Sequence, residues 1–392
     1  MKSRWTFRCY PTPEQAEHLN RTFGCARYVW NWALHARTEA FHRGDRKGYP
    51  ATSNDLTLLK KTPTHAWLND VSSVCLQQTL RDLQGAFSNF FDKRSAYPAF
   101  KRKAAKQSVN YTLGSFSLNI DTSTLRLAKI GAVKVVWSRP IPQCPSSIRL
   151  IRTASGKFFA SMVVEIQPKP LPKTGETVGI DFGVVRLATL SNGERIANPK
   201  YGKKWQQHLA HYQQRLARCQ KGSKRRLRVK RHIARIHEKI ANCRVDALHK
   251  FSTKLVTRFD AIYVEDLNLR GMVKNHSLAR SLNDASIGTA VRMLEYKAER
   301  YSKTVVKIDR WFPSSKTCSA CGHVVETLPL SVRDWVCPKC TASHDRDLNA
   351  AINIKAVGQT VSAHGGTVRR AAATAVERRS RRSANQQNVN CA

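Results

Sequence analysis

The spacing of apolar residues predicts two amphipathic helices in the first hundred residues. Residues 12–15 (Thr-Pro-Glu-Gln) have the form of a capping box with proline at the first helical position. Apolar side chains then recur every three or four positions up to Trp30, the period of a helix with one buried face. A second stripe of this spacing spans residues 72–91. We therefore expect residues 11–100 to form a small helical layer.

From residue 108 onward the apolar period changes to two, which is typical of strands. Val109, Tyr111 and Leu113 alternate with polar residues, and similar short runs follow, separated by turn-forming residues. Residues 108–168 are therefore predicted to form an antiparallel sheet or a small barrel. The strand-like residues 4–9 could pair with this sheet.

A second region follows a linker rich in proline and lysine at residues 168–175. Two strand-like runs within residues 177–190 are joined tightly at Gly183, so a new domain is expected to start near the end of the linker. Large apolar residues become rare towards the C-terminus, and the tail at 358–392 is predicted to be disordered.

Composition adds a strong charge signal to this plan. The 392 residues include 67 Lys and Arg but only 27 Asp and Glu, a formal net charge of +40. A balance this basic predicts a polyanionic partner, and nucleic acid is the natural choice. In residues 200–244, fifteen Lys or Arg residues accompany a single acid, Glu238. The helical periodicity of this segment, broken at Gly222, predicts a basic helical hairpin that contacts nucleic acid.

Apolar content and hydropathy limit the remaining protein classes. With 41% hydrophobic residues the chain can build real cores, which excludes a wholly disordered basic protein. Its length predicts two or three domains. The N-terminal residues lack the apolar segment of a signal peptide, and no 18 apolar residues occur in succession. We therefore expect a soluble intracellular protein with no membrane partner.

Four of the eleven cysteines have the spacing of a metal site. Cys318 and Cys321 form one C-x2-C pair, and Cys337 and Cys340 form another after fifteen residues. Two such pairs can place four thiolates tetrahedrally around one Zn²⁺, and four protein ligands leave no open position, so the expected site is structural. Two disulfides are the alternative, which an intracellular location disfavours. The flanking histidines are expected to be ordinary surface residues.

Three carboxylates stand out in this acid-poor chain. Asp181 lies in a strand-like run, in which it shares one face with Gly179 and Gly183. No neighbouring side chain covers it there, so a metal ion and a phosphate could approach it. Glu265 ends a short apolar strand-like run, where the sites of parallel sheets lie. Asp347 lies near the start of a predicted helix, on the face expected to pack on a sheet. Clustered together, these acids could hold the two Mg²⁺ ions that phosphodiester hydrolysis commonly uses.

The acids in these three segments also have simpler interpretations, which the residues alone leave open. Asp181 could be a surface group at the end of a strand, Asp266, next to Glu265, could form a turn, and Asp345, near Asp347, could cap the helix. The hydrolytic hypothesis depends on the convergence of Asp181, Glu265 and Asp347, which lie 84 and 82 positions apart in the sequence.

Taken together, these motifs resemble those of TnpB, the transposon-encoded relative of the type V CRISPR effectors. The resemblance covers residues 4–370, and all three acids are present, which argues against the inactivated, repressor-like members. It rests on the segments YPTPEQ (10–15), FGCARYVWN (23–31), VGID (178–181), VEDL (264–267), LEYKA (294–298), FPSSKTC (312–318), CPKC (337–340), HDRD (344–347) and AHGG (363–366).

The resemblance implies an RNA-guided DNA endonuclease with one structural Zn²⁺ and two catalytic Mg²⁺ ions. The implied fold class is a multidomain α+β and α/β protein, in which a helical recognition lobe is inserted in a wedge-like β-barrel and followed by an RNase H-like (RuvC) nuclease domain with a zinc-ribbon-like insert. The implied domains begin with the wedge-like barrel at 1–10 and 101–170 and the recognition lobe at 11–100. The RuvC-like domain is implied at 175–310 and 342–357, and it contains the basic hairpin at 200–244. The zinc-binding target-nucleic-acid-binding insert is implied at 311–341 and the tail at 358–392. The implied partners are a guide RNA from the transposon end and target DNA, double-stranded and single-stranded, beside a short adjacent motif. The implied location is the cytoplasm of a prokaryote, at the nucleoid.

Residue by residue, the family's catalytic Asp, Glu and Asp correspond to Asp181, Glu265 and Asp347, which would also hold the Mg²⁺ ions. The family pattern takes the aspartate two positions before Asn349, so Asp347 is preferred to Asp345. The order Asp, Glu, Asp also differs from the Asp, Asp, Glu order of RNase H-like cut-and-paste transposases.

Contacts with nucleic acid are predicted at two further places. By resemblance, Tyr49 and Gln77 lie where the family contacts its adjacent motif, and Ser73 lies one helical turn before Gln77. A glutamine can pair bidentately with adenine in the major groove. The other predicted contacts are Lys224, Arg225, Arg226 and Arg228 in the basic hairpin, and Arg333, which could reach the scissile phosphate.

Two alternatives remain open at this point. A guide-independent structure-specific nuclease or transposase accessory protein would use the same acids without RNA. A non-catalytic nucleic-acid-binding regulator would leave them without a chemical function.

Overall fold

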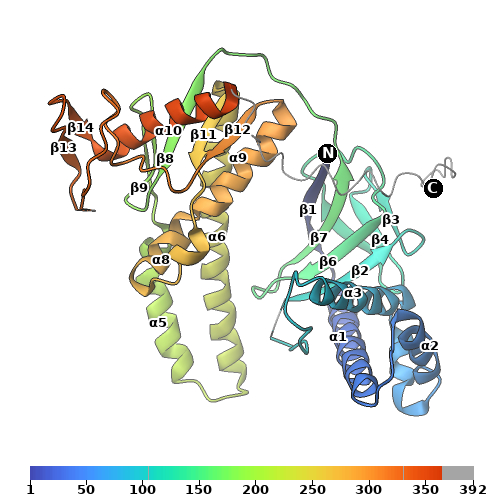
Figure 1. Cartoon of the computed structure of the whole chain (residues 1–392). Coiled ribbons are helices and arrows are strands. Elements are labelled where there is room, and N and C mark those ends of the chain that lie inside the picture. The colour runs from blue at the N-terminus through green and yellow to red at the C-terminus, as the bar shows by residue number, and fades with distance from the viewer. Residues whose placement is uncertain (105, 330, 364–392) are drawn as a thin grey trace. The chain divides into compact units, whose positions relative to one another are not determined.

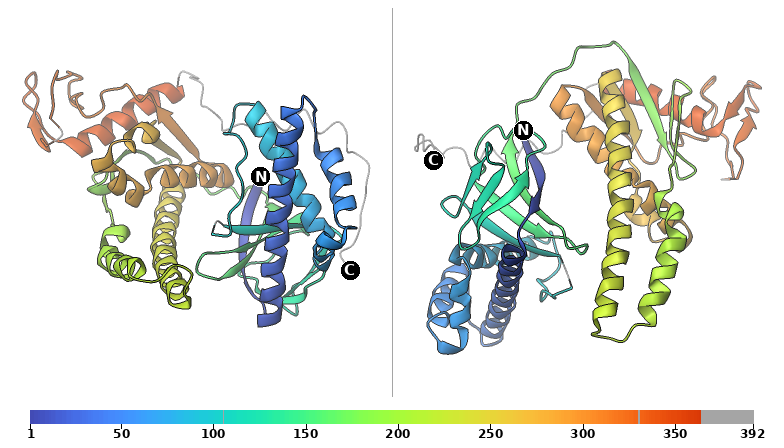
Figure 2. Two further views of the ribbon diagram at one scale, coloured as in Figure 1. Left: turned by 90° about the horizontal axis from the view of Figure 1, so that it is seen from below. Right: turned by 180° about the vertical axis from the view of Figure 1, so that it is seen from behind.

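The structure, a computed structural model, describes residues 1–104, 106–329 and 331–363 (Figures 1 and 2). The chain forms two compact units, one comprising residues 1–166 and one that begins at residue 167. Each unit has its own sheet and hydrophobic core. Within the described residues, no helix combines the length and the apolar character needed to cross a membrane.

The first unit contains a seven-stranded antiparallel sheet. Its order is β2-β6-β7-β1-β5-β4-β3. The N-terminal strand pairs with both β7 and β5, with Phe7 opposite Ala160 and Cys9 opposite Val135, so the predicted sheet and the pairing of residues 4–9 are confirmed. The strands are β1 (Lys2–Tyr10), β2 (Gln107–Thr112), β3 (Phe116–Asn119), β4 (Thr124–Leu127), β5 (Gly131–Val136), β6 (Ser147–Arg152) and β7 (Phe158–Glu165).

The predicted helical layer is inserted between β1 and β2. It comprises α1 (Pro13–His42), α2 (Tyr49–Leu59), the 3-10 helix η1 (Pro63–Asp70) and α3 (Ser73–Phe91). The capping box begins α1 as predicted: Oγ1 of Thr12 accepts a hydrogen bond from the backbone N–H of Gln15 at 3.2 Å, and Oε1 of Gln15 accepts one from the N–H of Thr12 at 3.1 Å. The periodicity did not resolve α2 and η1 as separate elements.

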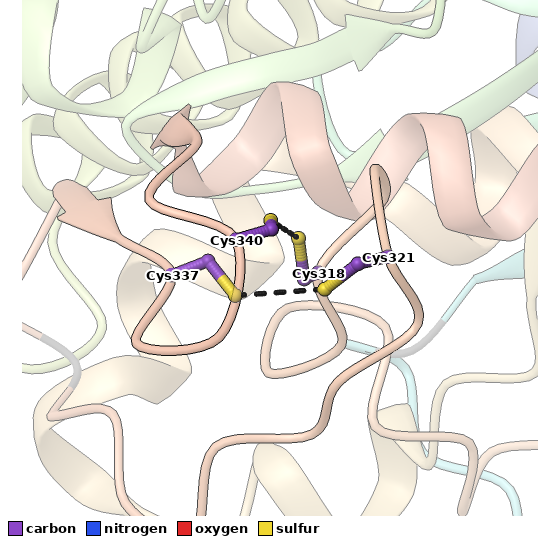
Figure 3. Close-up of side chains that lie close together, drawn as sticks. All are labelled: Cys318, Cys321, Cys337 and Cys340. Atoms are coloured by element: carbon purple, nitrogen blue, oxygen red, sulfur yellow. Dashed lines mark hydrogen bonds between the residues drawn. The ribbon is translucent and has the colours of Figure 1, made fainter.

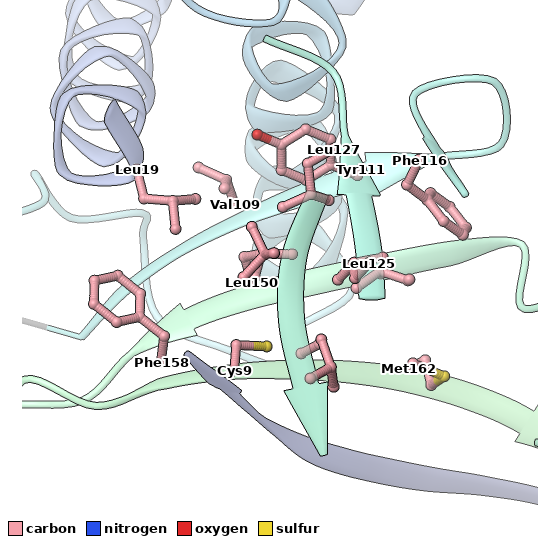
Figure 4. Close-up of a cluster of buried hydrophobic side chains, with 14 of the residues drawn as sticks. Cys9, Leu19, Val109, Tyr111, Phe116, Leu125, Leu127, Leu150, Phe158 and Met162 are labelled. Atoms are coloured by element: carbon pink, nitrogen blue, oxygen red, sulfur yellow. The ribbon is translucent and has the colours of Figure 1, made fainter. Parts of the chain in front are cut away.

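Alternating strand residues fill the interior of the barrel-like sheet, and helix α1 packs against it. Leu19 of α1 lies among strand side chains such as Val109 and Leu150 (Figure 4). Cys75 of α3 belongs to the same cluster, so both helices are anchored to the sheet. A separate cluster that includes Trp30 holds α1, α2 and α3 together.

The second unit contains a five-stranded mixed sheet of order β10-β9-β8-β11-β12. Strands β8, β11 and β12 are parallel, whereas β9 and β10 are antiparallel to their neighbours. The predicted pair of strand-like runs before residue 190 is confirmed as β8 and β9. The strands are β8 (Thr177–Phe182), β9 (Arg186–Leu190), β10 (Arg195–Ala197), β11 (Ala261–Glu265) and β12 (Thr304–Ile308), and β13 (Asp334–Val336) and β14 (Ser343–Asp345) form a separate hairpin.

Helices cover both faces of this mixed sheet. Val178 and Ile180 of β8 and Val264 of β11 share a buried cluster with α6 and α9. The opposite face carries Gly179 and Tyr263 and packs against α10, which lies over the parallel strands (Figure 1). The helices of this unit are α4 (Tyr201–Lys204), α5 (Gln206–Ala217), α6 (Lys224–Arg258), α7 (Leu269–Met272), α8 (His276–Ala285), α9 (Ile287–Tyr301) and α10 (Arg346–Ala363).

Two predicted boundaries differ from the structure. The basic helical hairpin is formed by α5 and α6, but α6 continues fourteen residues past the predicted end at 244, to Arg258, because its C-terminal half packs on the sheet. Helix α10 continues to Ala363, so residues 358–363 are helical rather than disordered. Gly358 allows this continuation, because α10 packs directly on Tyr263 there. The rest of the tail, 364–392, lies outside the described residues.

Candidate active site and metal centre

Two neighbouring parallel strands bring the first two predicted acids together. Ile180 of β8 is paired with Val264 of β11. Asp181 and Glu265 are the next residues on these strands. Because paired residues of a parallel ladder point to the same face, both carboxylates lie on the face opposite to Ile180 and Val264, where α10 packs.

Helix α10 brings the third acid to the same face. Gly179 of β8 lies so close to α10 that an added Cβ would be 2.2 Å from the carbonyl oxygen of Ala351. Asp347 precedes Ala351 by one helical turn, and Asp181 follows Gly179 by two strand positions. Nε2 of Gln359, near the other end of α10, donates to Oγ1 of Thr177 at 3.2 Å, so the helix runs antiparallel to β8 and its start lies near Asp181.

Asp181, Glu265 and Asp347 line one cavity of about 640 Å³. Burial, with smaller contributions from the nearby charges of Asp347 and Glu265, raises the pKa of Asp181 to about 8. Burial also raises the pKa of Glu265 above its ordinary value. Both of the other acids are therefore near enough to Asp181 for their charges to act on it.

Arginines border the same cavity and partly offset this negative charge. Nη1 of Arg333 lies 3.0 Å from Oδ1 of Asp347, and Nη1 of Arg186 lies 3.9 Å from Oδ2 of the same carboxylate. Arg310 and Arg346 also line the cavity. Arg333 was predicted to be near the scissile phosphate, and the structure places it beside a candidate catalytic acid.

The donor set of the cavity fits hard divalent cations. Carboxylate oxygens are the ligands that Mg²⁺ prefers. Burial and the charges of two neighbouring acids raise the pKa of Asp181, so added positive charge in the cavity would favour its ionised form. Among the described residues, a second group of candidate metal ligands is formed by Cys318, Cys321, Cys337 and Cys340, whose sulfur atoms all lie within 4.8 Å of one another.

Those four cysteines have the geometry of a zinc site. Sγ of Cys318 lies 3.6 Å from Sγ of Cys340, and Sγ of Cys321 lies 3.7 Å from Sγ of Cys337 (Figure 3). A Zn–S bond of about 2.3 Å in a tetrahedron requires sulfur atoms about 3.8 Å apart. The observed spacings therefore fit Zn²⁺. Disulfide bonds require S–S distances near 2 Å, so the cysteines are not paired in this way.

His344 is not the ordinary surface residue that we expected. Its side chain is half-buried, its Nε2 lies 3.0 Å from Sγ of Cys318, and its ring packs on Trp335 with centroids 4.8 Å apart. The reason is its place in β14, which pairs with β13 beside the cysteine cluster.

Two buried asparagines connect this cysteine cluster to the acidic cavity. Asn349 and Asn353 of α10 each donate a hydrogen bond to the carbonyl oxygen of Thr317, at 2.7 Å and 2.6 Å. Oδ1 of Asn349 also accepts a hydrogen bond from the N–H of Ser319 at 2.9 Å. The first cysteine pair is therefore attached directly to the helix that carries Asp347.

In the first unit, the residues predicted to contact an adjacent motif form one polar network. Oε1 of Gln77 accepts hydrogen bonds from Tyr49 at 3.1 Å and from Ser53 at 3.0 Å, and Nε of Arg81 donates to the Tyr49 hydroxyl at 3.2 Å. Ser73, also predicted, is exposed one turn earlier on α3. The sequence prediction missed Ser53, which is one turn after Tyr49 on α2 and faces the same way.

Arg226, one of the predicted nucleic-acid contacts in the basic hairpin, stabilises the hairpin itself. The guanidinium of Arg226 donates to the backbone carbonyls of Leu216 at 2.6 Å and Cys219 at 3.0 Å, which closes the turn between α5 and α6. Lys224, Arg225 and Arg228 are exposed on α6 and stay predicted contacts.

The sequence prediction also missed residues of the cavity wall. Arg310, Trp311 and Lys316 line the cavity, and all lie in the segment that follows β12. The available signal was the pair Arg310 and Trp311 just before the FPSSKTC segment, with Lys316 inside it. The fifteen basic residues of the hairpin gave a stronger signal.

Three family models match parts of the chain. One described as "Probable transposase" matches residues 161–276, one described as "Cas12f1-like, TNB domain" matches 288–354, and one described as "Helix-turn-helix domain" matches 1–46. In the structure, residues 1–46 contain β1 followed by the single long helix α1.

Two similar proteins match nearly the whole chain, and a third matches about a third of it. A Streptomyces pristinaespiralis protein named as an RNA-guided DNA endonuclease is 46% identical over 94% of this chain and 92% of its own. An Escherichia coli K12 protein with the same description, InsQ, is 31% identical over 92% of this chain and 94% of its own. A mimivirus protein described as TnpB-like is 30% identical over 35% of this chain.

A solved structure shows a similar fold. It is that of a Cas12f1–sgRNA–target DNA complex, with a TM-score of 0.53 at 14% identity, and it covers 88% of this chain and 83% of that one. The fold, the motifs and the full-length similarity agree, and the chain therefore belongs to the TnpB family, whose curated relatives are named as RNA-guided DNA endonucleases.

Proposed function

We propose that this protein is a transposon-encoded, RNA-guided endonuclease that cuts DNA beside a short adjacent motif by Mg²⁺-dependent, two-metal hydrolysis in a RuvC-like domain. The observation that carries the proposal is that Asp181, Glu265 and Asp347 line one arginine-bordered cavity. The names of the relatives and the likeness to Cas12f1, solved with an sgRNA and target DNA, support RNA guidance and DNA as the substrate.

In this proposal the three carboxylates hold the catalytic cations. Bound Mg²⁺ would supply positive charge at the phosphate and make a water molecule more acidic. Arg333 and Arg186 would exchange their contacts with Asp347 for the phosphate oxygens of the substrate, where a guanidinium can bind bidentately.

The remaining predicted residues have supporting functions. One Zn²⁺ on Cys318, Cys321, Cys337 and Cys340 would keep this segment folded against α10. The hydrogen bonds that Gln77 accepts from Tyr49 and Ser53 orient its amide, so that Nε2 can donate to an acceptor on a base of the adjacent motif.

We propose that the basic hairpin binds the phosphate backbone of a guide RNA from the transposon end. Lys224, Arg225 and Arg228 are the residues of α6 that support this assignment, because they are exposed. As the relatives named above include bacterial proteins, the expected place of action is the bacterial cytoplasm, at the nucleoid.

The decisive experiment combines RNA sequencing with a cleavage assay. Protein purified from cells carrying the whole transposon is expected to retain an RNA, and the loaded protein should cut DNA that matches this RNA only in the presence of Mg²⁺. Asp181→Ala should reduce cleavage to background while DNA binding persists, because the phosphate contacts remain.

Two outcomes would favour the alternatives. Cleavage of branched or transposon-end DNA by RNA-free protein would indicate a guide-independent nuclease. RNA-loaded protein that binds matched DNA but never cuts it, at any Mg²⁺ concentration, would indicate a non-catalytic regulator.

A further inference from the structure

Trp311 is an exposed aromatic side chain in the wall of the candidate active site. Its relative exposure is 84%, the highest among the exposed large hydrophobic side chains of the described residues. It lines the same cavity as Asp181, Glu265 and Asp347. Tryptophan is highly buried on average, so its exposure beside these acids calls for a functional explanation.

The backbone that carries the indole is firmly held. The N–H of Trp311 donates to Oδ1 of Asp309 at 2.9 Å. The next residue, Phe312, packs against the cluster formed by β11, β12 and α10, and the preceding residue, Arg310, is ion-paired with Asp266. The indole is therefore presented to the cavity from a fixed position, although its own ring is unpacked.

The chemistry of the cavity determines what could cover this ring. Arg186, Lys316 and Arg333 line the same cavity and would attract a phosphodiester backbone. A nucleic acid brings bases with its phosphates, and aromatic side chains bind bases by stacking, with little dependence on sequence. In a duplex both faces of each base are already stacked, so only an unpaired base can offer a free face to Trp311.

We propose that Trp311 stacks on an unpaired nucleobase beside the scissile phosphate and thereby positions a single strand, or an unwound stretch of duplex, for cutting. This inference rests on the proposed nuclease function and adds the residue that makes the site selective for unpaired DNA. A partner protein at Trp311 is the competing occupant, and the cationic lining of the cavity disfavours it.

Stacking can be measured without cleavage. The probe is a single-stranded DNA oligonucleotide that carries 2-aminopurine, bound at saturation by full-length, RNA-loaded Asp181→Asn protein. The fluorescence of 2-aminopurine should be quenched on binding. We expect Trp311→Ala to lose most of this quenching and Trp311→Phe to keep most of it, because phenylalanine still offers an aromatic face.

Cleavage by protein with the acids intact provides the second measurement. Trp311→Ala should slow the cutting of matched DNA about tenfold or more, given the usual strength of base–aromatic stacking. Trp311→Phe should stay within about threefold of the unmodified protein on the same basis. Phe41→Ala is the matched control, because Phe41 of α1 is 75% exposed and does not line this cavity. It should change neither the quenching nor the rate.

The outcomes separate this inference from the proposed function. Quenching that depends on Trp311 in a protein that never cuts DNA would support stacking and refute the nuclease. Normal cleavage with quenching unaffected by Trp311→Ala would overturn the stacking inference and leave the nuclease intact. Loss of a protein complex in Trp311→Ala, with unchanged quenching, would assign the indole to a partner protein instead.

Discussion

Two aspartates at the start of α10, Asp345 and Asp347, make different contacts although they lie only two positions apart. Oδ1 of Asp345 accepts the N–H of Leu348 at 2.9 Å, and its Oδ2 is bound by Arg195 at 2.8 Å. Asp345 is therefore a helix cap fixed by an ion pair. Asp347 lies in the first turn of α10 and lines the cavity, where it contributes to the raised pKa of Asp181.

Amide substitutions of these two residues should affect cleavage to very different extents. Asp345→Asn keeps a good cap, so we expect cleavage within about threefold and a stability loss within about 1 kcal/mol. Asp347→Asn should reduce cleavage at least about a hundredfold, since metal-site carboxylates supply several kcal/mol to such reactions. Its melting temperature in chelator should change little, because the ion pair lost with Arg333 is partly exposed and such pairs contribute little to stability. Guided cleavage rates and thermal melts measure both effects, and an equal loss of activity in both variants would contradict the assignment.

At the scale of elements, the site depends on how closely α10 packs on the sheet. Gly179 lies under Ala351, and Gly358 lies over Tyr263, where an added Cβ would be 2.2 Å from a ring carbon. Both contacts place the helix near the sheet surface. The separation of Asp347 from Asp181 is therefore set by two residues that take no part in the chemistry.

Gly179→Ala should consequently damage both stability and activity. The added methyl group meets backbone atoms, which cannot rotate away, so we expect a loss of about 1–3 kcal/mol and slower cleavage. Gly85→Ala in α3 is the control, because an added Cβ there has no neighbour within 4 Å. It should be neutral or stabilise the protein by up to about 1 kcal/mol. Denaturant unfolding and cleavage assays test the pair, and equal behaviour would show that α10 can shift freely.

A second element contact fixes the linker before β8. Asp260 accepts hydrogen bonds from the N–H groups of Thr174 at 2.9 Å and Gly175 at 2.8 Å, and it pairs with the buried Lys303 at 2.5 Å. The hydrogen bond from Lys303, with those from the linker, lowers the pKa of Asp260 to about 2. Residues 168–175 are thus a linker in sequence, but their end is attached to the second unit.

The pKa of Asp260 predicts a particular dependence of stability on pH. A carboxyl with a lowered pKa stabilises the fold above its ordinary pKa of 3.8, and this contribution disappears as the pH falls through about 2. The melting temperature of Asp260→Asn should therefore lie below that of the unmodified protein at pH 5–7. The difference should narrow between pH 4 and 2. If the difference in melting temperature between the two proteins did not change with pH over this range, the charge of Asp260 would not contribute to stability.

At the scale of the whole molecule, the dominant property is the net charge of +40. Such an excess binds phosphates without sequence preference and makes affinity depend steeply on salt. The basic hairpin carries a large share of this charge, but its basic residues differ in function. Arg226 closes the turn, whereas Lys224, Arg225 and Arg228 are exposed.

Salt titration can separate these uses. Replacing Lys224, Arg225 and Arg228 together by Gln should reduce the slope of log affinity against log salt by about 2–3, if each contacts one phosphate. Arg226→Gln should instead lower the melting temperature of the protein and change the slope by less than about 1. A triple variant with an unchanged slope would exclude the hairpin from the nucleic-acid interface.

Local patterns were enough to predict the parts of this protein that depend on neighbours in the sequence. The capping box before α1, the change of apolar period at residue 108 and the cysteine spacing all follow from residues a few positions apart. These features express backbone hydrogen bonding and side-chain periodicity, which act within one or two turns of a helix or along one strand.

Tertiary structure decided which of these features act together. Asp181 and Glu265 converge because β8 and β11 pair in one particular register, and Asp347 joins them because Gly179 lets α10 approach. The separate tasks of Asp345 and Arg226 and the exposure of Trp311 also became visible only in the fold. Register and helix docking are settled by packing across the whole unit, so no local pattern of residues specifies them.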